Sequence, residues 1–248
     1  MEYLERTYRN RVRGRGLVSF HVCSKESDLL ISVDRASFVP ELPGVALSLL
    51  NECRRELEEF LLRDPEFGRA LEPYPVSPKA PRLARMMAAA AARAGVGPMA
   101  AVAGAIAEVV GRRLLRYVEE VIVENGGDIF LKALSPRTVG IFAGASPLSE
   151  RVGLLVRPSP GFYGICTSSG TVGPSLSFGR ADAAVVVGST AALADAVATA
   201  LGNRVQTAAD FPAALNFACQ IRGVLGAVVI QGDKLGALGK IELVPLSG

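Results

Sequence analysis

Tryptophan is absent from this sequence, histidine occurs once, and aromatic residues of all kinds are scarce. Aromatics make up 6% of the 248 residues, whereas hydrophobic residues make up 50%. The core must therefore be built from Ala, Val, Leu and Ile, which pack closely between thin layers. His21 is the single candidate for any His–Asp or His–Cys relay, but a lone histidine in an alternating strand is more often structural than catalytic.

Cysteine pairs are also missing. The four cysteines lie far apart with no Cys-x-x-Cys spacing, which argues against a zinc site and a disulfide framework and fits a reducing cytosol. The charged N-terminus has no apolar targeting stretch, and the uncharged run over 94–107 is too short to cross a bilayer. We therefore expect a soluble, cytoplasmic protein without a membrane partner.

Neither sign of charge dominates the chain. The 27 basic and 24 acidic residues give a net charge of +3, so the composition carries no nucleic-acid footprint. Four arginines alternate near the N-terminus, where an extended segment would present them on one face. A solvated edge strand is the usual meaning of this pattern, and contact with a phosphate or a partner is the alternative. The four are Arg9, Arg11, Arg13 and Arg15.

Hydrophobic periodicity predicts an α+β protein, with alternating runs indicating strands and apolar residues three to four apart indicating helices. The predicted elements, in order, are a hairpin over 15–34, helices over 44–63, 81–93 and 98–116, strands over 119–125, 128–134, 138–144, 153–158, 162–166 and 181–188, helices over 190–202 and 211–223, and a hairpin over 224–246. This order suggests a single domain over 1–248 with two similar halves, about 1–118 and 119–248. Its sheets are expected to be mainly antiparallel and packed by helices.

The helix predicted over 190–202 is apolar on nearly every face and is therefore expected to be buried on nearly every face. Asp195 and Thr199 are its polar exceptions, and a spacing of four stacks them on one side. A buried carboxylate needs a cation or several donors, and a carboxylate with a hydroxyl suits Mg²⁺. The alternative is that Asp195 accepts backbone hydrogen bonds while Thr199 bonds to its own helix.

A Gly/Ser/Thr-rich loop follows the strand predicted over 162–166. Small hydroxyl residues and glycine let phosphate oxygens approach backbone N–H groups. Its uncharged composition continues for a dozen residues, and so long a loop is more often functional than idle. A solvated turn is the alternative. The residues predicted to contact a ligand are Thr167, Ser168, Ser169, Gly170 and Ser177.

Two further segments have a structural and a functional interpretation. The run Asn125, Gly126, Gly127, Asp128 is typical of a hairpin turn between apolar strands, but its polar groups also suit a ribose or metal-water contact. The glycine-rich segment that ends at Met99 either lets the following helix pack closely or forms an anion site at its N-terminus.

Four motifs, in order, resemble those of the ApbE-like superfamily, whose best-known members are Mg²⁺-dependent FAD:protein FMN transferases. They are GAIAE at 104–108, ENGGDI at 124–129, GICTSSG at 164–170 and ADAVATA at 194–200. The whole chain further resembles a compact, functionally uncharacterised branch of that superfamily. The resemblance implies a T-fold-like architecture with FAD or FMN lying across the loops, and it makes a homodimer our expectation.

The resemblance also implies a metal held by Asp195, Thr199 and the backbone carbonyl of Ala107. Two departures bear on activity: Glu108 stands where the superfamily has Lys, and the segment 174–177 has no histidine. Nucleotide binding can therefore persist while transfer is lost or altered, and no catalytic base is assigned.

Three functions follow. The first is Mg²⁺-dependent binding of a flavin nucleotide, with transfer or hydrolysis at its phosphate linkage. The second is a non-catalytic flavin or nucleotide carrier. The third is a pterin- or purine-converting T-fold enzyme.

Overall fold

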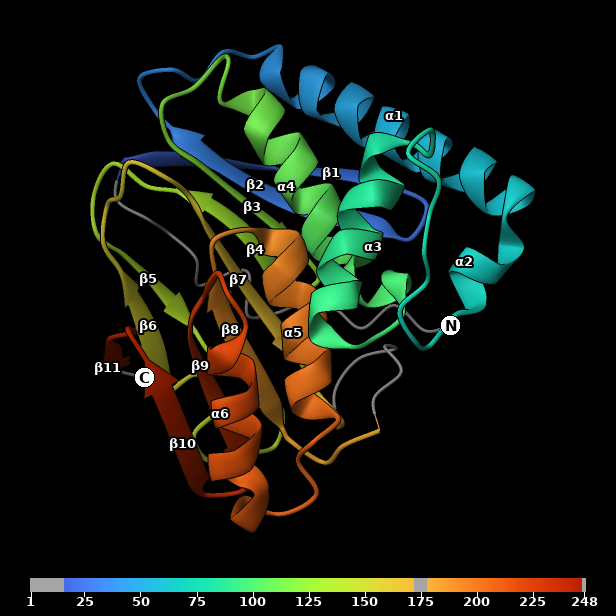
Figure 1. Ribbon diagram of the computed structural model, residues 1–248. Helices are drawn as coiled ribbons and strands as arrows, with labels where there is room; N and C mark the ends of the chain where they lie inside the picture. Colours follow the sequence, from blue (N-terminus) through green and yellow to red (C-terminus); the bar gives the residue numbers. More distant parts are fainter. Residues whose placement is uncertain (1–15, 172–177, 247–248) are drawn as a thin grey trace.

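A large antiparallel sheet forms the middle of the structure (Figure 1). The computed structural model describes residues 16–171 and 178–246. All four N-terminal arginines and Ser177 therefore lie outside the described residues. The arginines are Arg9, Arg11, Arg13 and Arg15. The predictions made for these five residues stay predictions.

The larger sheet has eight strands, and a smaller sheet of three strands lies on one of its faces. Every pair of neighbouring strands in both sheets is antiparallel. The eight strands, in spatial order, are β1 (Leu17–Ser24), β2 (Ser27–Asp34), β3 (Val121–Asn125), β4 (Asp128–Lys132), β7 (Tyr163–Ser168), β8 (Ala183–Gly188), β9 (Val224–Gln231) and β10 (Lys234–Gly239). The three strands are β11 (Leu243–Pro245), β6 (Val152–Val156) and β5 (Arg137–Gly140).

The helices gather on the other face of the large sheet, so the protein has three layers (Figure 1). They are α1 (Leu42–Arg63), α2 (Pro65–Arg69), α3 (Arg82–Ala94), the 3-10 turn η2 (Pro98–Ala101), α4 (Val102–Leu114), α5 (Ala191–Gly202), the 3-10 turn η3 (Ala208–Asp210) and α6 (Phe211–Gln220). Within the described residues no single helix has the length and composition to span a membrane, and α3 with the η2–α4 segment does so only as a pair bent by 102°.

Each face of the large sheet has its own core. The core under the helices contains side chains such as Val123, Phe130 and Val186. The core against the small sheet contains Leu131, Ile165 and Val185. Because neighbouring residues of a strand point to opposite faces, a strand between two cores is apolar throughout rather than alternating. Strand β8 shows this directly, since all six of its residues are buried.

The α+β class and the antiparallel sheets packed by helices are confirmed. Several boundaries differ from the prediction, and one of them bears on the site: Thr167 and Ser168 are the last residues of β7 rather than loop residues, because they pair with Val185 and Ala184 of β8. The final hairpin ends at β10, and the chain then crosses to the small sheet as β11. Helix α2 was not predicted. The division into two similar halves stays a prediction.

Candidate functional site

Helix α5 is buried almost completely, as its composition predicted. It packs against β7 and β8 on the sheet and against α3 and α4 beside it. The Thr190 hydroxyl caps its first turn by accepting a hydrogen bond from Leu193 N at 3.3 Å. Of the residues Ala191–Gly202, only Asp195 and Thr199 are not fully buried. A spacing of four places both on one side, so this strip is the partly exposed part of α5.

The carboxylate of Asp195 lies against the start of α4. Gly104 N donates to Asp195 Oδ2 at 2.8 Å, and only glycine fits there because a Cβ at position 104 would come within 2.4 Å of Ala191 O. Burial raises the pKa of Asp195 to about 7, while the backbone N–H groups of Gly104 and Ala103 pull it in the opposite direction. Asp195 therefore accepts an amide donor, as one interpretation predicted, and is still under-compensated as an anion.

The turn between β3 and β4 brings two more polar side chains to the same place. Gly126 and Gly127 have φ values of 70° and 105°, the left-handed conformation that glycine adopts readily, which confirms the hairpin turn. Asn125 Nδ2 donates to Ala103 O at 3.1 Å, so the turn is tied to the start of α4. Asn125 lies two residues from Val123, on the face beneath the helices.

Asp128 is the second buried acid of this group. It is buried, and its Oδ1 has no hydrogen-bond partner among the described residues. Burial raises the pKa of Asp128 well above its ordinary value, and the charge of Asp195 raises it further. A buried carboxylate oxygen without a donor is costly, and such groups cluster at functional sites.

Cys166 lies next in register to Asp128, one residue beyond the pair Ile129–Ile165. It is buried, and its Sγ donates to Ala191 O at 3.4 Å. Burial and the negative charge of Asp128 raise the pKa of the thiol well above its ordinary value. Cys166 is therefore a neutral thiol, which disfavours a nucleophilic role.

The loop after β7 starts beside the last turn of α5. A Cβ at Gly202 would lie 3.5 Å from Ser168 Oγ, so the Ser168 hydroxyl is close to the turn that contains Thr199. Gly170 N already donates to Ala181 O at 2.9 Å, and Thr171 Oγ1 donates to an Asp182 oxygen at 3.0 Å. Gly170 and Thr171 at the start of the loop are thus tied to the residues before β8, and the Gly170 amide is engaged within the protein.

Phe178, a large aromatic side chain that is 59% exposed, was not predicted as a site residue. Its backbone N donates to Asn203 Oδ1 at 2.9 Å and its carbonyl accepts from Gln206 Nε2 at 2.8 Å, which fixes it at the C-terminal end of α5. An exposed ring in this position can stack on a planar ligand. The signal was a lone aromatic residue within a Gly/Ser/Thr-rich segment.

Two other predicted site residues, Met99 and Ala107, differ in how far they are buried. Met99 is partly buried in η2, which packs against α5. Ala107 is fully buried in α4, one turn beyond Gly104. The observed contacts of Asp195 are with the start of α4, and the role of the Ala107 carbonyl as a metal ligand stays a prediction.

The oxygen groups of this site suit a hard cation that keeps part of its water shell. Asp195 and Thr199 offer a carboxylate and a hydroxyl from one strip of α5, and the orphaned Oδ1 of Asp128 is buried nearby. In the part of the chain that the structure describes, no group of three or more His, Cys, Asp or Glu side chains is arranged to hold a metal. Any ion here would therefore rely on hydroxyl, carbonyl, water and ligand oxygens, as Mg²⁺ commonly does.

Glu108, which replaces the lysine of the resemblance, is buried inside the protein. Its Oε2 accepts from Ala191 N at 2.8 Å and from Ala192 N at 3.3 Å, and its Oε1 lies 2.7 Å from Arg112. His21 lies on the edge strand β1, with Nδ1 3.8 Å from Asp28. The expectation that His21 is structural rather than catalytic stays a prediction.

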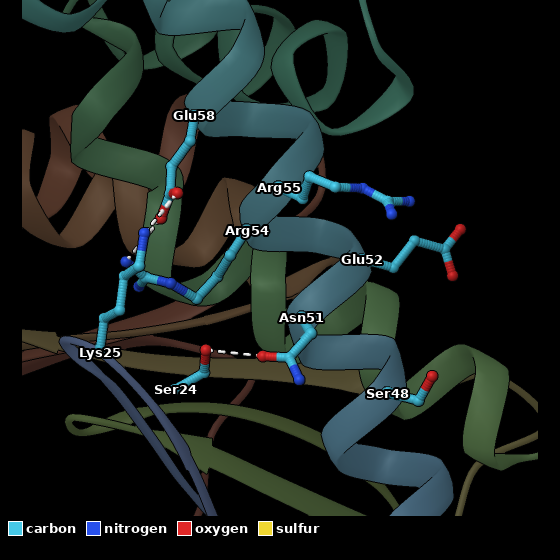
Figure 2. A pocket seen from close by; sticks show the side chains of 8 residues that line it. All are labelled: Ser24, Lys25, Ser48, Asn51, Glu52, Arg54, Arg55 and Glu58. Carbon is cyan, nitrogen blue, oxygen red and sulfur yellow. Dashed lines mark hydrogen bonds and ion pairs between the residues drawn. The ribbon is translucent and has the colours of Figure 1, made fainter.

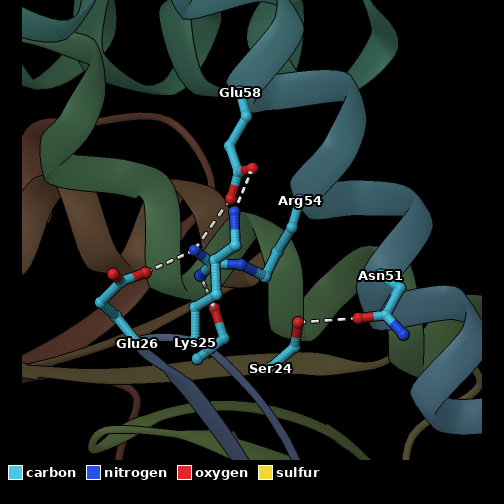
Figure 3. Close-up of polar contacts among 7 residues, drawn as sticks. Ser24, Lys25, Glu26, Asn51, Arg54 and Glu58 are labelled. Atoms are coloured by element: carbon cyan, nitrogen blue, oxygen red, sulfur yellow. Dashed lines mark hydrogen bonds and ion pairs between the residues drawn. The ribbon is translucent and has the colours of Figure 1, made fainter.

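A groove between α1 and the β1–β2 turn is lined by polar side chains, and several of these pair with one another (Figure 2). Lys25 Nζ lies 2.6 Å from Glu58, and Arg54 contacts Glu58 at 3.0 Å and also Glu26 (Figure 3). Ser24 donates to Asn51 at 2.7 Å. This network clamps the hairpin to α1. The residues that line the groove are Ser24, Lys25, Ser48, Asn51, Glu52, Arg54, Arg55 and Glu58.

Solved structures with a similar fold include two ApbE proteins. The flavin transferase ApbE from Vibrio cholerae aligns with a TM-score of 0.51 and 18% identity, covering 90% of this chain and 96% of that one. The ApbE protein from Thermotoga maritima aligns with a TM-score of 0.61 and 12% identity, covering 89% and 96%. At these identities the likeness establishes the ApbE-like fold.

Sequence relatives cover most of the chain. A UPF0280 protein of Methanocella arvoryzae is 47% identical over 204 residues, which are 81% of this chain and 82% of the relative. Another from Methanosphaerula palustris is 42% identical over 230 residues, 91% and 92% of the two chains. The family model described as "AbpE bacteria" matches residues 9–231. The superfamily expected from the four motifs is thereby confirmed, and the chain belongs to the AbpE bacteria family.

Proposed function

We propose that this chain binds a flavin nucleotide, FAD or FMN, together with Mg²⁺ at the α4–α5 site, which we define as Ala103, Gly104, Asn125, Asp128, Asp195 and Thr199. The observation that carries the proposal is that the two partly exposed residues of α5 are a carboxylate and a hydroxyl, beside a buried Asp128 oxygen without a donor. The fold shared with flavin transferases supports the ligand class.

Asp195 and Thr199 would hold the ion, with the Ala107 carbonyl as the third protein ligand that the resemblance implies. When bound, Mg²⁺ supplies positive charge that polarises a pyrophosphate. The Ser168 hydroxyl, near the last turn of α5, would donate to a phosphate oxygen, and the exposed ring of Phe178 would stack on the planar part of the nucleotide.

We further propose that the site acts on the phosphate linkage of FAD. In this reaction an acceptor hydroxyl or water attacks the phosphorus of the FMN half. A new P–O bond forms, the pyrophosphate P–O bond breaks, AMP leaves with the bridging oxygen, and the acceptor loses a proton. Donors fixed in a dry site favour the developing negative charge because they need no reorganisation.

A non-catalytic carrier is the second candidate, and one observation favours it. Glu108 stands where the transferases have lysine. Its carboxylate accepts a hydrogen bond from the N-terminus of α5 and pairs with Arg112. The site therefore lacks that cation and gains a fixed anion one helical turn from Gly104. A pterin or purine ligand is the third candidate, which rests on the proposed two-half, T-fold-like arrangement.

Incubating the pure protein with FAD and Mg²⁺ separates these candidates. AMP release or a mass increase equal to FMN on the protein or an added acceptor supports phosphate-linkage chemistry. Saturable FAD binding with neither product supports the carrier. Retention of a pterin or purine together with failure to bind FAD would overturn the flavin proposal.

A further inference from the structure

Two carboxylates join α4 and α5, one helical turn apart. Gly104 N of α4 donates to Asp195 of α5 at 2.8 Å, and Ala191 N of α5 donates to Glu108 of α4 at 2.8 Å. The helices run antiparallel at this contact, since the later residue of α4 meets the earlier residue of α5. A carboxylate of each helix thus accepts a hydrogen bond from a backbone N–H of the other helix. Together the two hydrogen bonds limit both sliding of the helices along their axes and rotation about them.

The two helices approach closely at Gly104. A Cβ on Gly104 would lie 2.4 Å from Ala191 O and 2.8 Å from Asp195 Cβ, so the helix backbones touch directly. Hydrogen bonds are directional, so the two carboxylate contacts help to specify one register of the helices at this close approach.

Glu108 is held firmly enough to act as the fixed point. It is 2% exposed, and its second oxygen pairs with Arg112 at 2.7 Å. The Arg112 guanidinium lies 3.9 Å from the centroid of the Phe162 ring, and that ring packs on Phe130 of β4 with centroids 5.1 Å apart. This chain of contacts connects α4, the start of α5 and the sheet. The first N–H groups of α5 have no partner within the helix, and Glu108 supplies one.

We infer that Glu108 is a positioning residue that fixes the register of α5 on α4 and so holds Asp195 and Thr199 opposite the start of α4. Its effect on metal and nucleotide rests on the proposed function, whereas its effect on the helix contact does not. The same carboxylate occupies the N-terminus of α5, where an anionic ligand would otherwise be favoured.

The test compares Glu108→Ala and Glu108→Gln with Glu52→Ala as a matched control. Glu52 also pairs with an arginine of α4, Arg113, at 3.0 Å, but from the side of α1. One readout is the exchange rate of the Gly104 backbone amide by NMR, which reports its contact with Asp195. The other is the affinity for Mn²⁺, used alone as a probe.

Glu108→Ala is expected to speed Gly104 exchange and to weaken Mn²⁺ binding by about tenfold or more, as seen when partners of metal ligands are removed. Glu108→Gln keeps an acceptor oxygen for Ala191 N and is expected to restore most of both values. Glu52→Ala is expected to change neither. A role in stability alone would speed exchange across the whole core and would leave the Mn²⁺ affinity of the folded protein unchanged, which would overturn the inference.

Should Glu108→Ala fail to fold, Arg112→Met decides the matter. It keeps an apolar side chain near Phe162 while removing the cation that holds Glu108. Faster Gly104 exchange in this variant supports positioning, and unchanged exchange overturns it. If the wild-type protein binds no Mn²⁺, the proposed metal site fails, while the Gly104 exchange rates still decide the role of Glu108.

Discussion

Replacing Asp195 with asparagine should stabilise the metal-free protein, although it removes a carboxylate from the proposed site. The asparagine side chain has the same shape, and its carbonyl oxygen can still accept from Gly104 N. It carries no charge, so the cost of burying an anion near Asp128 is removed. A gain in stability combined with a loss of metal binding is typical of a site whose residues are selected for function.

The size and sign of the effect follow from the raised pKa. The pKa of Asp195 rises from 3.8 to about 7 on folding. A carboxyl group with a higher pKa in the folded state loses stability as pH rises, beginning near the unfolded value and complete above the folded value. At about 1.36 kcal/mol per pKa unit, the cost is about 1.7 kcal/mol at pH 5 and about 4 kcal/mol at pH 8. The gain from Asp195→Asn should therefore grow by about 2.5 kcal/mol between pH 5 and pH 8.

Urea unfolding with a chelator present, at about pH 5 and about pH 8, measures this difference. Asp233→Asn serves as the control, because the Asp233 side chain is 73% exposed in the β9–β10 turn and its loss should have little effect at either pH. A stability difference between Asp195→Asn and wild type that is independent of pH would refute the electrostatic argument.

Three further predictions test the surroundings of the site. Thr199→Ala should weaken Mn²⁺ binding with little loss of stability, since Thr199 is partly exposed. Thr199→Ser keeps the hydroxyl and should retain binding, so an equal loss of binding in both variants would contradict a hydroxyl ligand. Gly104→Ala should lower the free energy of unfolding by about 1–3 kcal/mol through overpacking against α5. Gly44→Ala should not lower it, because the space around the Cβ position of Gly44 in α1 is open. Urea unfolding measures both variants. A thiol reagent should modify exposed Cys23 in the native protein and spare Cys166 until unfolding, and rapid native modification of Cys166 would contradict its burial and raised pKa.

The sequence predicted the elements and the key helix because their signals are local. An apolar run with two polar residues four apart predicts that α5 is buried. It also predicts which side of the helix is polar. The pair of glycines after Asn125 likewise predicted the turn, since their positive φ values are a property of that dipeptide.

The remainder depended on contacts between distant residues. Gly104 and Asp195 are 91 positions apart, and no local pattern indicates that a glycine in one helix meets a carboxylate in another. Glu108 could have been a surface charge, and its burial follows from where α5 begins against α4. Thr167 and Ser168 have loop-like composition, but pairing with β8 makes them strand residues, an outcome that tertiary context decides.

The measurement that tests the central claim most directly is the binding of FAD to the wild-type protein and to Asp195→Asn, each with Mg²⁺ and with a chelator. Quenching of flavin fluorescence reports binding in all four conditions. We expect tight binding by the wild-type protein with Mg²⁺ and weak binding in the other three conditions. Equal FAD binding in all four, or none in any, would contradict a nucleotide site built around the Asp195 carboxylate.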